Sequence, residues 1–175
     1  LTTSYLWFAL TFWVYLETRS VLATAFIGGS YMLLIAVVGV PFGTWVDRTR
    51  KKRVMVVAQL VTTAAFALAV SLYLVTPRAE LLRIGGWQFA LFVGIVLVGA
   101  VVESARNIAL STCVTLLIDE AERDKVNGLV GMVGGLSFAA TSVFSGLSVG
   151  QLGMTWTLVI ALVLSVASLL HLLPV

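Results

Sequence analysis

The stretch GTWVDRTRKKRV, residues 43–54, places one acid and five bases between two long apolar segments of the chain. A basic run at the end of an apolar segment is typical of the cytoplasmic end of a membrane span, where lysine and arginine are enriched. The stretch therefore predicts a turn between two transmembrane helices, and the rest of the sequence can be read outward from that turn.

Composition supports a membrane protein. Of the 175 residues, 60% are hydrophobic and 11% are charged, whereas a soluble domain carries about 25% charged residues. The apolar residues form continuous runs near or above the roughly 18–20 residues that cross a hydrocarbon core, which favours helices over a β-barrel. The net charge of +3 comes mainly from one loop, which argues against a nucleic-acid-binding face.

The fold class predicted is an all-α membrane protein with one domain, residues 1–175. The first span would be only about 24 Å long at 1.5 Å per residue, so we expect its beginning to be missing. No methionine start and no signal peptide are evident. The six expected spans are residues 1–16, 21–45, 53–75, 87–112, 126–149 and 154–173.

The orientation follows from the bases in the short loops. The loops after the second and fourth spans together hold seven bases, and the loops on the other side hold three, Arg19, Arg78 and Arg83. The seven-base side is predicted to be cytoplasmic, which also places both ends of a six-span chain in the cytoplasm. The expected location is the cytoplasmic (inner) membrane, with the lipid bilayer as a partner.

The opening stretch has two interpretations. As a topological anchor it needs only its bases. Gly43 and Asp47 suggest a more specific use, because glycine permits close backbone approach and an aspartate can face a helix N-terminus. Arg48, Lys51 and Lys52 can in addition bind carboxylates at a neighbouring helix end.

The residues of this stretch resemble the major facilitator superfamily of secondary transporters, whose loop between helices 2 and 3 reads G-x-L-a-D-R-x-G-R-K. The glycine, aspartate, arginine and basic pair match, whereas Trp45 and Arg50 depart from the pattern. FWVYLETRS (12–20) and ERDKVNGLVG (122–131) resemble the end of helix 1 and the start of helix 5 in drug, macrolide and siderophore exporters of that superfamily.

The resemblance implies two inverted three-helix repeats that form the N-terminal half of a twelve-helix carrier, with the C-terminal half absent. It also implies that the stretch is a cytoplasmic latch between the two halves. Its expected acidic partners lie at the inner end of the fourth span: Asp119, Glu120 and Glu122.

The fourth span carries the residues that are most costly in a membrane. Glu103 and Arg106 are three apart and share a helical face, and Asn107 follows four residues after Glu103. Ionisable groups at membrane depth usually pair or face a wet cavity. These residues are therefore the candidate proton or substrate site, and the alternative is a permanently ionised structural pair. Burial favours the neutral acid and the arginine favours the carboxylate, so the sequence leaves both open.

The fifth span carries small residues three or four apart, which predicts a ridge for close helix packing. Its members are Gly128, Gly131, Gly135, Ala139, Ser142 and Gly146. An antiporter motif of the same superfamily occupies this helix around a Gly-Pro pair, but no proline occurs between 126 and 149. Packing is therefore the preferred interpretation of the ridge.

The predicted function is proton-coupled efflux of a small amphiphilic organic compound by alternating access, with protons and that compound as partners. Uptake of a metabolite and a six-span scaffold or half-transporter are the alternatives. An enzyme is not expected, because the sequence lacks a nucleophile–base pair and a phosphate loop. No cofactor or metal is expected: Cys113 is the single cysteine and His171 the single histidine.

Overall fold

The computed structural model describes residues 2–83 and 85–173, apart from the side chain at position 115. Every regular element in these ranges is helical. The α-helices are α1 (Thr2–Thr18), α2 (Val21–Arg48), α3 (Lys51–Val75), α4 (Arg78–Leu81), α5 (Trp87–Leu117), α6 (Glu120–Leu147) and α7 (Gly153–Leu172), and a π-helical segment, η1 (Ser148–Leu152), joins the last two.

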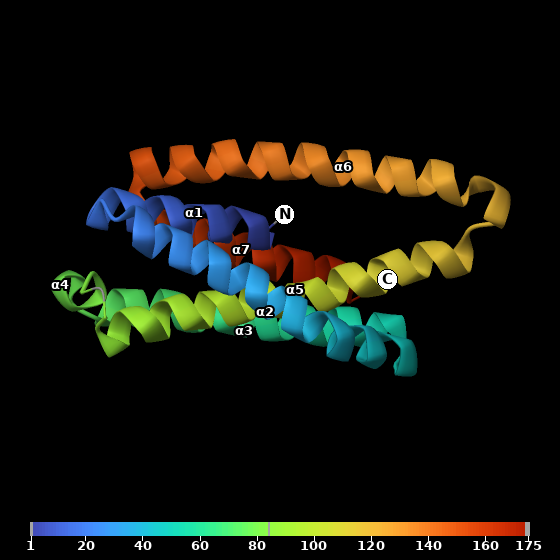
Figure 1. The fold of residues 1–175 in the computed structure, drawn as a ribbon, viewed down its shortest axis with the longest axis horizontal. Helices are drawn as coiled ribbons and strands as arrows, with labels where there is room; N and C mark the ends of the chain where they lie inside the picture. Colours follow the sequence, from blue (N-terminus) through green and yellow to red (C-terminus); the bar gives the residue numbers. More distant parts are fainter. Residues whose placement is uncertain (1, 84, 174–175) are drawn as a thin grey trace.

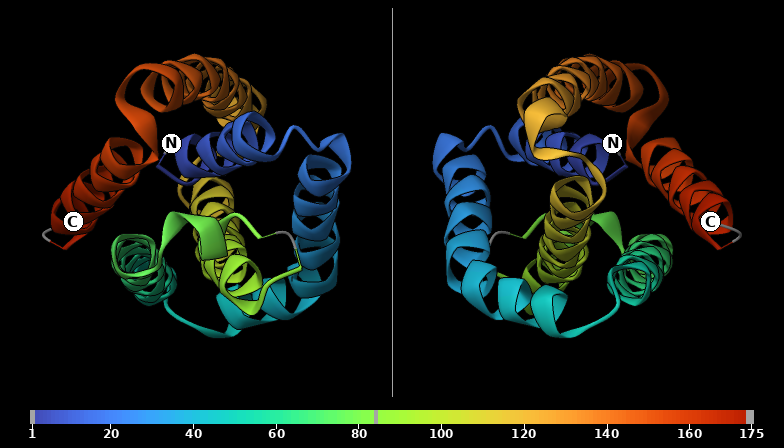
Figure 2. Two further views of the ribbon diagram at one scale, coloured as in Figure 1. Left: turned by 90° about the vertical axis from the view of Figure 1, so that its left-hand side faces the viewer. Right: turned by 90° about the vertical axis from the view of Figure 1, so that its right-hand side faces the viewer.

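The long helices lie side by side along the long axis of the molecule (Figure 1). The α2–α3 and α5–α6 turns lie at one end, and the α1–α2 turn, α4 and η1 lie at the other. Figure 2 shows α5 in the interior, surrounded by α1, α2 and α3, with α6 beyond α1 and α7 packed beside α3 and α1. The seven bases predicted to be cytoplasmic therefore share one end of the bundle.

Four helical stretches within the described residues are long and apolar enough to cross a membrane: Val21–Arg48, Lys51–Val75, Trp87–Val114 and Glu120–Leu172. The last of these contains α6, η1 and α7, and Figure 1 shows α6 and α7 running in opposite directions. Gly153, the first residue of α7, has φ +80° and ψ 171°, a backbone region that is essentially restricted to glycine. This glycine ends the π-helical segment and allows the chain to reverse.

The packing of α3 against α5 depends on a second glycine. A Cβ at Gly99 would lie 2.9 Å from Cε1 of Phe66 and 3.2 Å from Cβ of Ala65. The Thr62 hydroxyl donates a hydrogen bond of 3.0 Å to the Gly99 carbonyl. Helices in lipid gain stability from close van der Waals packing and interhelical hydrogen bonds, and both are present at this contact.

A buried polar cluster joins α3 to α7. The Gln59 amide donates to the Ser165 carbonyl at 3.2 Å and to the Ser165 hydroxyl at 3.0 Å. The hydroxyls of Thr63 and Ser165 are 2.8 Å apart, and Gln59 is only 2% exposed. This cluster was not predicted from the sequence, although a glutamine within an apolar helix is a recognisable signal of interhelical bonding.

Several helices differ in extent from the predicted spans. α6 begins at Glu120 rather than 126, so most of the charged segment expected between spans is helical, and its first turn carries Glu120 and Glu122. Acidic side chains stabilise a helix N-terminus, which explains the early start. α5 continues to Leu117, five residues beyond the predicted 112, and the loop expected between the third and fourth spans contains the short helix α4.

The α2–α3 turn contains only Thr49 and Arg50, because α2 continues to Arg48 and α3 begins at Lys51. Thr49 has φ −123° and Arg50 has φ −60°, both in extended conformation. Neither residue needs the left-handed region that favours glycine. An arginine is therefore accommodated at position 50, where the G-x-L-a-D-R-x-G-R-K pattern has its second glycine.

Candidate functional site

Glu103 and Arg106 form an ion pair within α5, which we call the central pair. Nε and Nη2 of Arg106 each lie 2.5 Å from Oε1 of Glu103. The spacing i, i+3 on a helix brings both side chains to one face, as the sequence predicted. Glu103 is 6% exposed, whereas the Arg106 side chain is 26% exposed, so the carboxylate is the buried member of the pair.

The second oxygen of Glu103 is unsatisfied. Oε2 is buried and has no hydrogen-bond partner among the residues that the structure describes. On α1, the same holds for Oγ1 of Thr3, the hydroxyl of Tyr5 and Nε1 of Trp7. An orphaned buried polar atom costs about 1–3 kcal/mol, more when it is charged. Oε2 of Glu103 is therefore available to a proton, a water or a polar group of a ligand.

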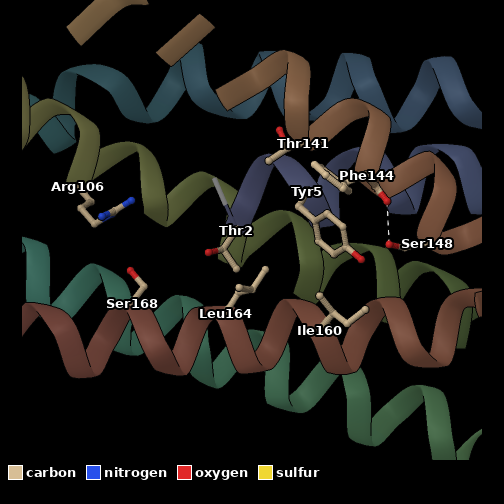
Figure 3. Close-up of a pocket in the computed structure, with 9 residues that line it drawn as sticks. All are labelled: Thr2, Tyr5, Arg106, Thr141, Phe144, Ser148, Ile160, Leu164 and Ser168. Atoms are coloured by element: carbon tan, nitrogen blue, oxygen red, sulfur yellow. Dashed lines mark hydrogen bonds between the residues drawn. The ribbon is translucent and has the colours of Figure 1, made fainter. Parts of the chain in front are cut away.

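The arginine of the central pair borders a cavity of about 650 Å³ between α1, α5, α6 and α7. Figure 3 shows Arg106 reaching toward the space that Tyr5 enters from α1 and Ile160 and Leu164 border from α7. The volume falls within the roughly 300–1,000 Å³ of small-molecule sites. The lining residues are Thr2, Tyr5, Arg106, Thr141, Phe144, Ser148, Ile160, Leu164 and Ser168.

The chemistry of this cavity is mixed. Tyr5, Phe144, Ile160 and Leu164 provide aromatic and aliphatic surface. Hydroxyl groups from α1, α6 and α7 supply hydrogen-bonding positions, and Arg106 is the single charged side chain among the lining residues. Such a lining suits a molecule that is partly apolar and partly polar, because a few fixed polar groups orient a ligand held mainly by apolar contact.

Asn107, the third residue of the predicted site, lies elsewhere. Its side chain is exposed, and it borders a separate hollow on α5 with Ile108, Ser111 and Thr112. One helical residue turns the side chain by about 100°, so the residue after Arg106 points away from the cavity that Arg106 faces. The structure thus brings Glu103 and Arg106 together and leaves Asn107 apart.

The α2–α3 turn is held by its own lysines. Nζ of Lys51 lies 2.8 Å from the Val46 carbonyl and 3.3 Å from the Asp47 carbonyl, so it caps the C-terminus of α2. Nζ of Lys52 donates to the Leu173 carbonyl at 3.2 Å and connects the turn to the end of α7. A lysine near a helix C-terminus stabilises its free carbonyls.

The residues expected to form a latch share one end of the bundle without direct pairing. Within residues 2–83 and 85–173, no ion pair joins Arg48, Lys51 or Lys52 to the acids Asp119, Glu120 and Glu122. The two ion pairs present there are Arg78–Glu17 and the central pair. A Cβ at Gly43 would meet no described atom within 4 Å, so the close approach expected at this glycine is not made by any described helix.

The small-residue ridge of α6 is used at one end. Gly146 packs against the ring of Phe12 on α1, which would lie 3.6 Å from an added Cβ. At Gly128, Gly131 and Gly135 an added Cβ would meet no described atom within 4 Å. Ala139 is exposed and Ser142 is half-buried. Within the described helices the ridge therefore packs only where α6 meets α1.

Apolar helices of membrane-spanning length around a buried ion pair and a cavity define a multi-pass membrane protein. The sequence profile of the Major Facilitator Superfamily matches residues 1–175. The chain belongs to the Major Facilitator Superfamily, whose members are membrane transporters and not enzymes. Neither the curated proteins nor the solved structures include a match to this chain.

Proposed function

We propose that this chain is the N-terminal half of a secondary transporter that exports a small amphiphilic organic compound in exchange for protons. The observation that carries the proposal is the buried Glu103 carboxylate, which has one oxygen bound by Arg106 and the other without a partner among the described residues. Its ion-pair partner Arg106 lines the 650 Å³ cavity, so Arg106 connects the carboxylate to that cavity.

The ion pair links proton binding to the cavity. An ionised carboxylate in apolar surroundings is costly unless its oxygens are bonded, and a proton on Oε2 would remove the charge. Protonation would also weaken the hold of Glu103 on Arg106 and would leave the positive charge of Arg106 without a neutralising carboxylate beside the cavity. Substrate and proton can influence each other's binding in this way without any direct contact between them.

The helix contacts support a six-crossing half built from two repeats, α1–α3 and α5–α7. Exchanging α1 with α5, α2 with α6, and α3 with α7 turns the α2–α5 contact into α6–α1 and the α3–α5 contact into α7–α1. Both of these contacts exist, and the α3–α7 and α1–α5 contacts map onto themselves. This is the pattern of inverted repeats in secondary transporters.

A second six-helix unit is part of the proposal, because α2 and α6 offer surfaces for it. Only 6% of the most apolar 18-residue stretch of α2 is buried, and most of the glycine ridge of α6 has no described helix packed against it. Alternating access would then be a rocking of the two units about the cavity. The α2–α3 turn would act as the latch: Asp47 would face bases of the second unit, and the bases near Asp47 would face its acids, across the cytoplasmic end.

Protons are a sufficient energy source for such a carrier. One proton entering down about 100 mV contributes roughly 2.3 kcal/mol, and each pH unit adds about 1.4 kcal/mol. Together these sustain a substrate gradient on the order of a few hundredfold for one proton per cycle. ATP is therefore not required for export.

The test is a flux assay on the full-length transporter in proteoliposomes with an imposed pH gradient. We expect Glu103→Gln to abolish gradient-driven flux while substrate binding persists, because glutamine keeps the shape but cannot exchange a proton. Glu80→Gln is the matched control, since Glu80 is exposed on the short helix α4 and accepts a hydrogen bond from the Gln88 amide. Unchanged pH-dependent flux in Glu103→Gln would contradict the proposal.

The latch is tested separately with Asp47→Asn. We expect a lower transport rate at normal membrane insertion, because an asparagine cannot form ion pairs with bases of the facing unit. Wild-type rates would leave the α2–α3 turn with only its topological role. The sign of the flux in the same vesicles distinguishes export from uptake.

A further inference from the structure

The cytoplasmic end of α3 carries a hollow of about 360 Å³, lined by Arg50, Lys52, Arg53, Val56 and Val57. We propose that this basic hollow is a binding site for an anionic phospholipid, with the phosphate held by the bases and an acyl chain lying against the two valines. The proposal rests on the membrane-spanning character of α3 and not on the direction or coupling of transport.

The arrangement of the lining residues follows from helix geometry. Arg50, Arg53 and Val57 are related by i, i+3 and i+7, and Lys52 and Val56 by i, i+4, so the bases and the valines fall on neighbouring rows of the same helix surface. The valines lie one turn deeper into the apolar segment than the bases. The hollow therefore changes from charged to apolar along α3, in the direction from headgroup to hydrocarbon.

The positive charges of the three bases in the hollow are not neutralised by an acidic side chain among the described residues. The two ion pairs found among the described residues involve neither Arg50, Lys52 nor Arg53. Nζ of Lys52 bonds a backbone carbonyl, that of Leu173, which does not neutralise it. The nearest acid along the chain, Asp47, is exposed on the last turn of α2 and forms no ion pair with these bases. Arginine can bind a phosphate group in a bidentate manner, and lysine binds phosphate as a point charge.

The position of the hollow decides in favour of a lipid over a soluble anion. α3 starts at Lys51, where its 25-residue span leaves the membrane, and Figure 2 shows α3 at the outer edge of the bundle. Val57 is 43% exposed and Val56 is half-buried. A soluble phosphate would leave these valines uncovered, whereas a lipid satisfies both parts of the hollow.

The test uses the purified full-length transporter in detergent, delipidated and then titrated with short-chain phosphatidylglycerol or phosphatidylcholine, with bound lipid counted by native mass spectrometry. We expect phosphatidylglycerol to bind in preference. The double variant Arg50→Gln/Arg53→Gln should weaken its binding on the order of tenfold to thirtyfold, as expected for two bases at a membrane surface. The double variant Arg83→Gln/Lys125→Gln removes the same charge from exposed positions outside the hollow and should bind as wild type does.

A second variant separates a lipid from a free anion and does not depend on removing charge. Val57→Trp keeps all three bases and fills the hollow, and tryptophan is well tolerated at a membrane interface. We expect this variant to lose phosphatidylglycerol but to retain the same weak binding of inorganic phosphate as wild type. Equal affinity for the two lipids, or unchanged phosphatidylglycerol binding in both variants, would overturn the proposal. Full displacement of the lipid by inorganic phosphate would reduce the hollow to a simple anion site.

Discussion

Gly99 is a position of close approach between α3 and α5, because its missing side chain makes room for the ring of Phe66. A methyl group there would lie 2.9 Å from Cε1 of Phe66, a distance that forces the ring or a helix to move. We expect Gly99→Ala to lower the free energy of unfolding by about 1–3 kcal/mol, the usual effect of overpacking a close contact.

Chemical unfolding in detergent, followed by circular dichroism, measures this change. Gly94→Ala is the matched control on the same helix, since an added Cβ at Gly94 meets no described atom within 4 Å. Alanine is the better helix former by up to about 1 kcal/mol, so the control should be neutral or stabilising. Equal effects of the two substitutions would contradict the role assigned to Gly99.

Gln59 provides a second prediction at the residue scale. Replacing it by leucine removes two hydrogen bonds to Ser165 on α7 and leaves that hydroxyl with Thr63. Interhelical hydrogen bonds in membrane proteins contribute about 0.6 kcal/mol on average and up to about 1.7 kcal/mol. We expect Gln59→Leu to lower the free energy of unfolding by about 0.6–1.7 kcal/mol. The control Gln88→Leu removes a solvent-exposed hydrogen bond to Glu80 and should lower it less.

Single residues show what the sequence could and could not predict about the site. Glu103 and Arg106 were identified because charges at membrane depth are costly, and their spacing predicted that they pair. Which oxygen stays unsatisfied and which member faces the cavity depend on the packing of α1, α6 and α7 around them. Such contacts between distant segments leave no periodic signal in one sequence, and for the same reason the partners of Gln59 were not predicted.

At the scale of the element, the turn from α6 to α7 depends on Gly153. Its φ of +80° and ψ of 171° lie in a region where a Cβ costs of order 1–3 kcal/mol. We expect Gly153→Ala to destabilise the protein by about that amount and to loosen the α6–α7 connection. Limited proteolysis of the turn and the thermal midpoint in detergent measure the two effects.

Gly150 offers the matched control for this substitution. It lies in the π-helical segment η1, three residues before Gly153. An added Cβ there would meet no described atom within 4 Å, and its φ is not in the positive range. Gly150→Ala should therefore leave both the midpoint and the proteolytic pattern close to those of wild type. A Gly153→Ala protein indistinguishable from Gly150→Ala would show that the turn tolerates a side chain.

Helix boundaries illustrate the limits of hydropathy. The apolar runs of the sequence overlap each long helix that the structure describes, because a lipid-crossing segment needs an uninterrupted apolar stretch. They missed the charged first turn of α6, Glu120–Asp124, because charge was read as the end of a span although acids at a helix start are stabilising. The packing ridge on α6 stays a prediction from Gly128 to Gly135, because no described helix packs against it there.

At the scale of the whole molecule, the distribution of bases is the feature that the sequence and the fold share. The end formed by the α2–α3 and α5–α6 turns carries Arg48, Arg50, Lys51, Lys52, Arg53, Arg123 and Lys125, and the other end carries Arg19, Arg78 and Arg83. The sequence could not predict that α5 occupies the centre of the bundle or that α2 and α6 are largely exposed. Both follow from which helices find close-packing partners, such as the Gly99 contact.

The asymmetry of the bases predicts the orientation in the membrane, because translocation disfavours short loops rich in lysine and arginine. In a background with Cys113→Ser, we expect Lys125→Cys to react with a membrane-impermeant maleimide only after the cells are permeabilised. Arg83→Cys, in the α4–α5 loop at the opposite end, should react in intact cells. The reverse pattern would place the α2–α3 turn outside the cell, where neither a cytoplasmic latch nor a site for the anionic lipids of the inner leaflet could operate. The same two variants therefore test the common premise of both proposals before any flux or lipid binding is measured.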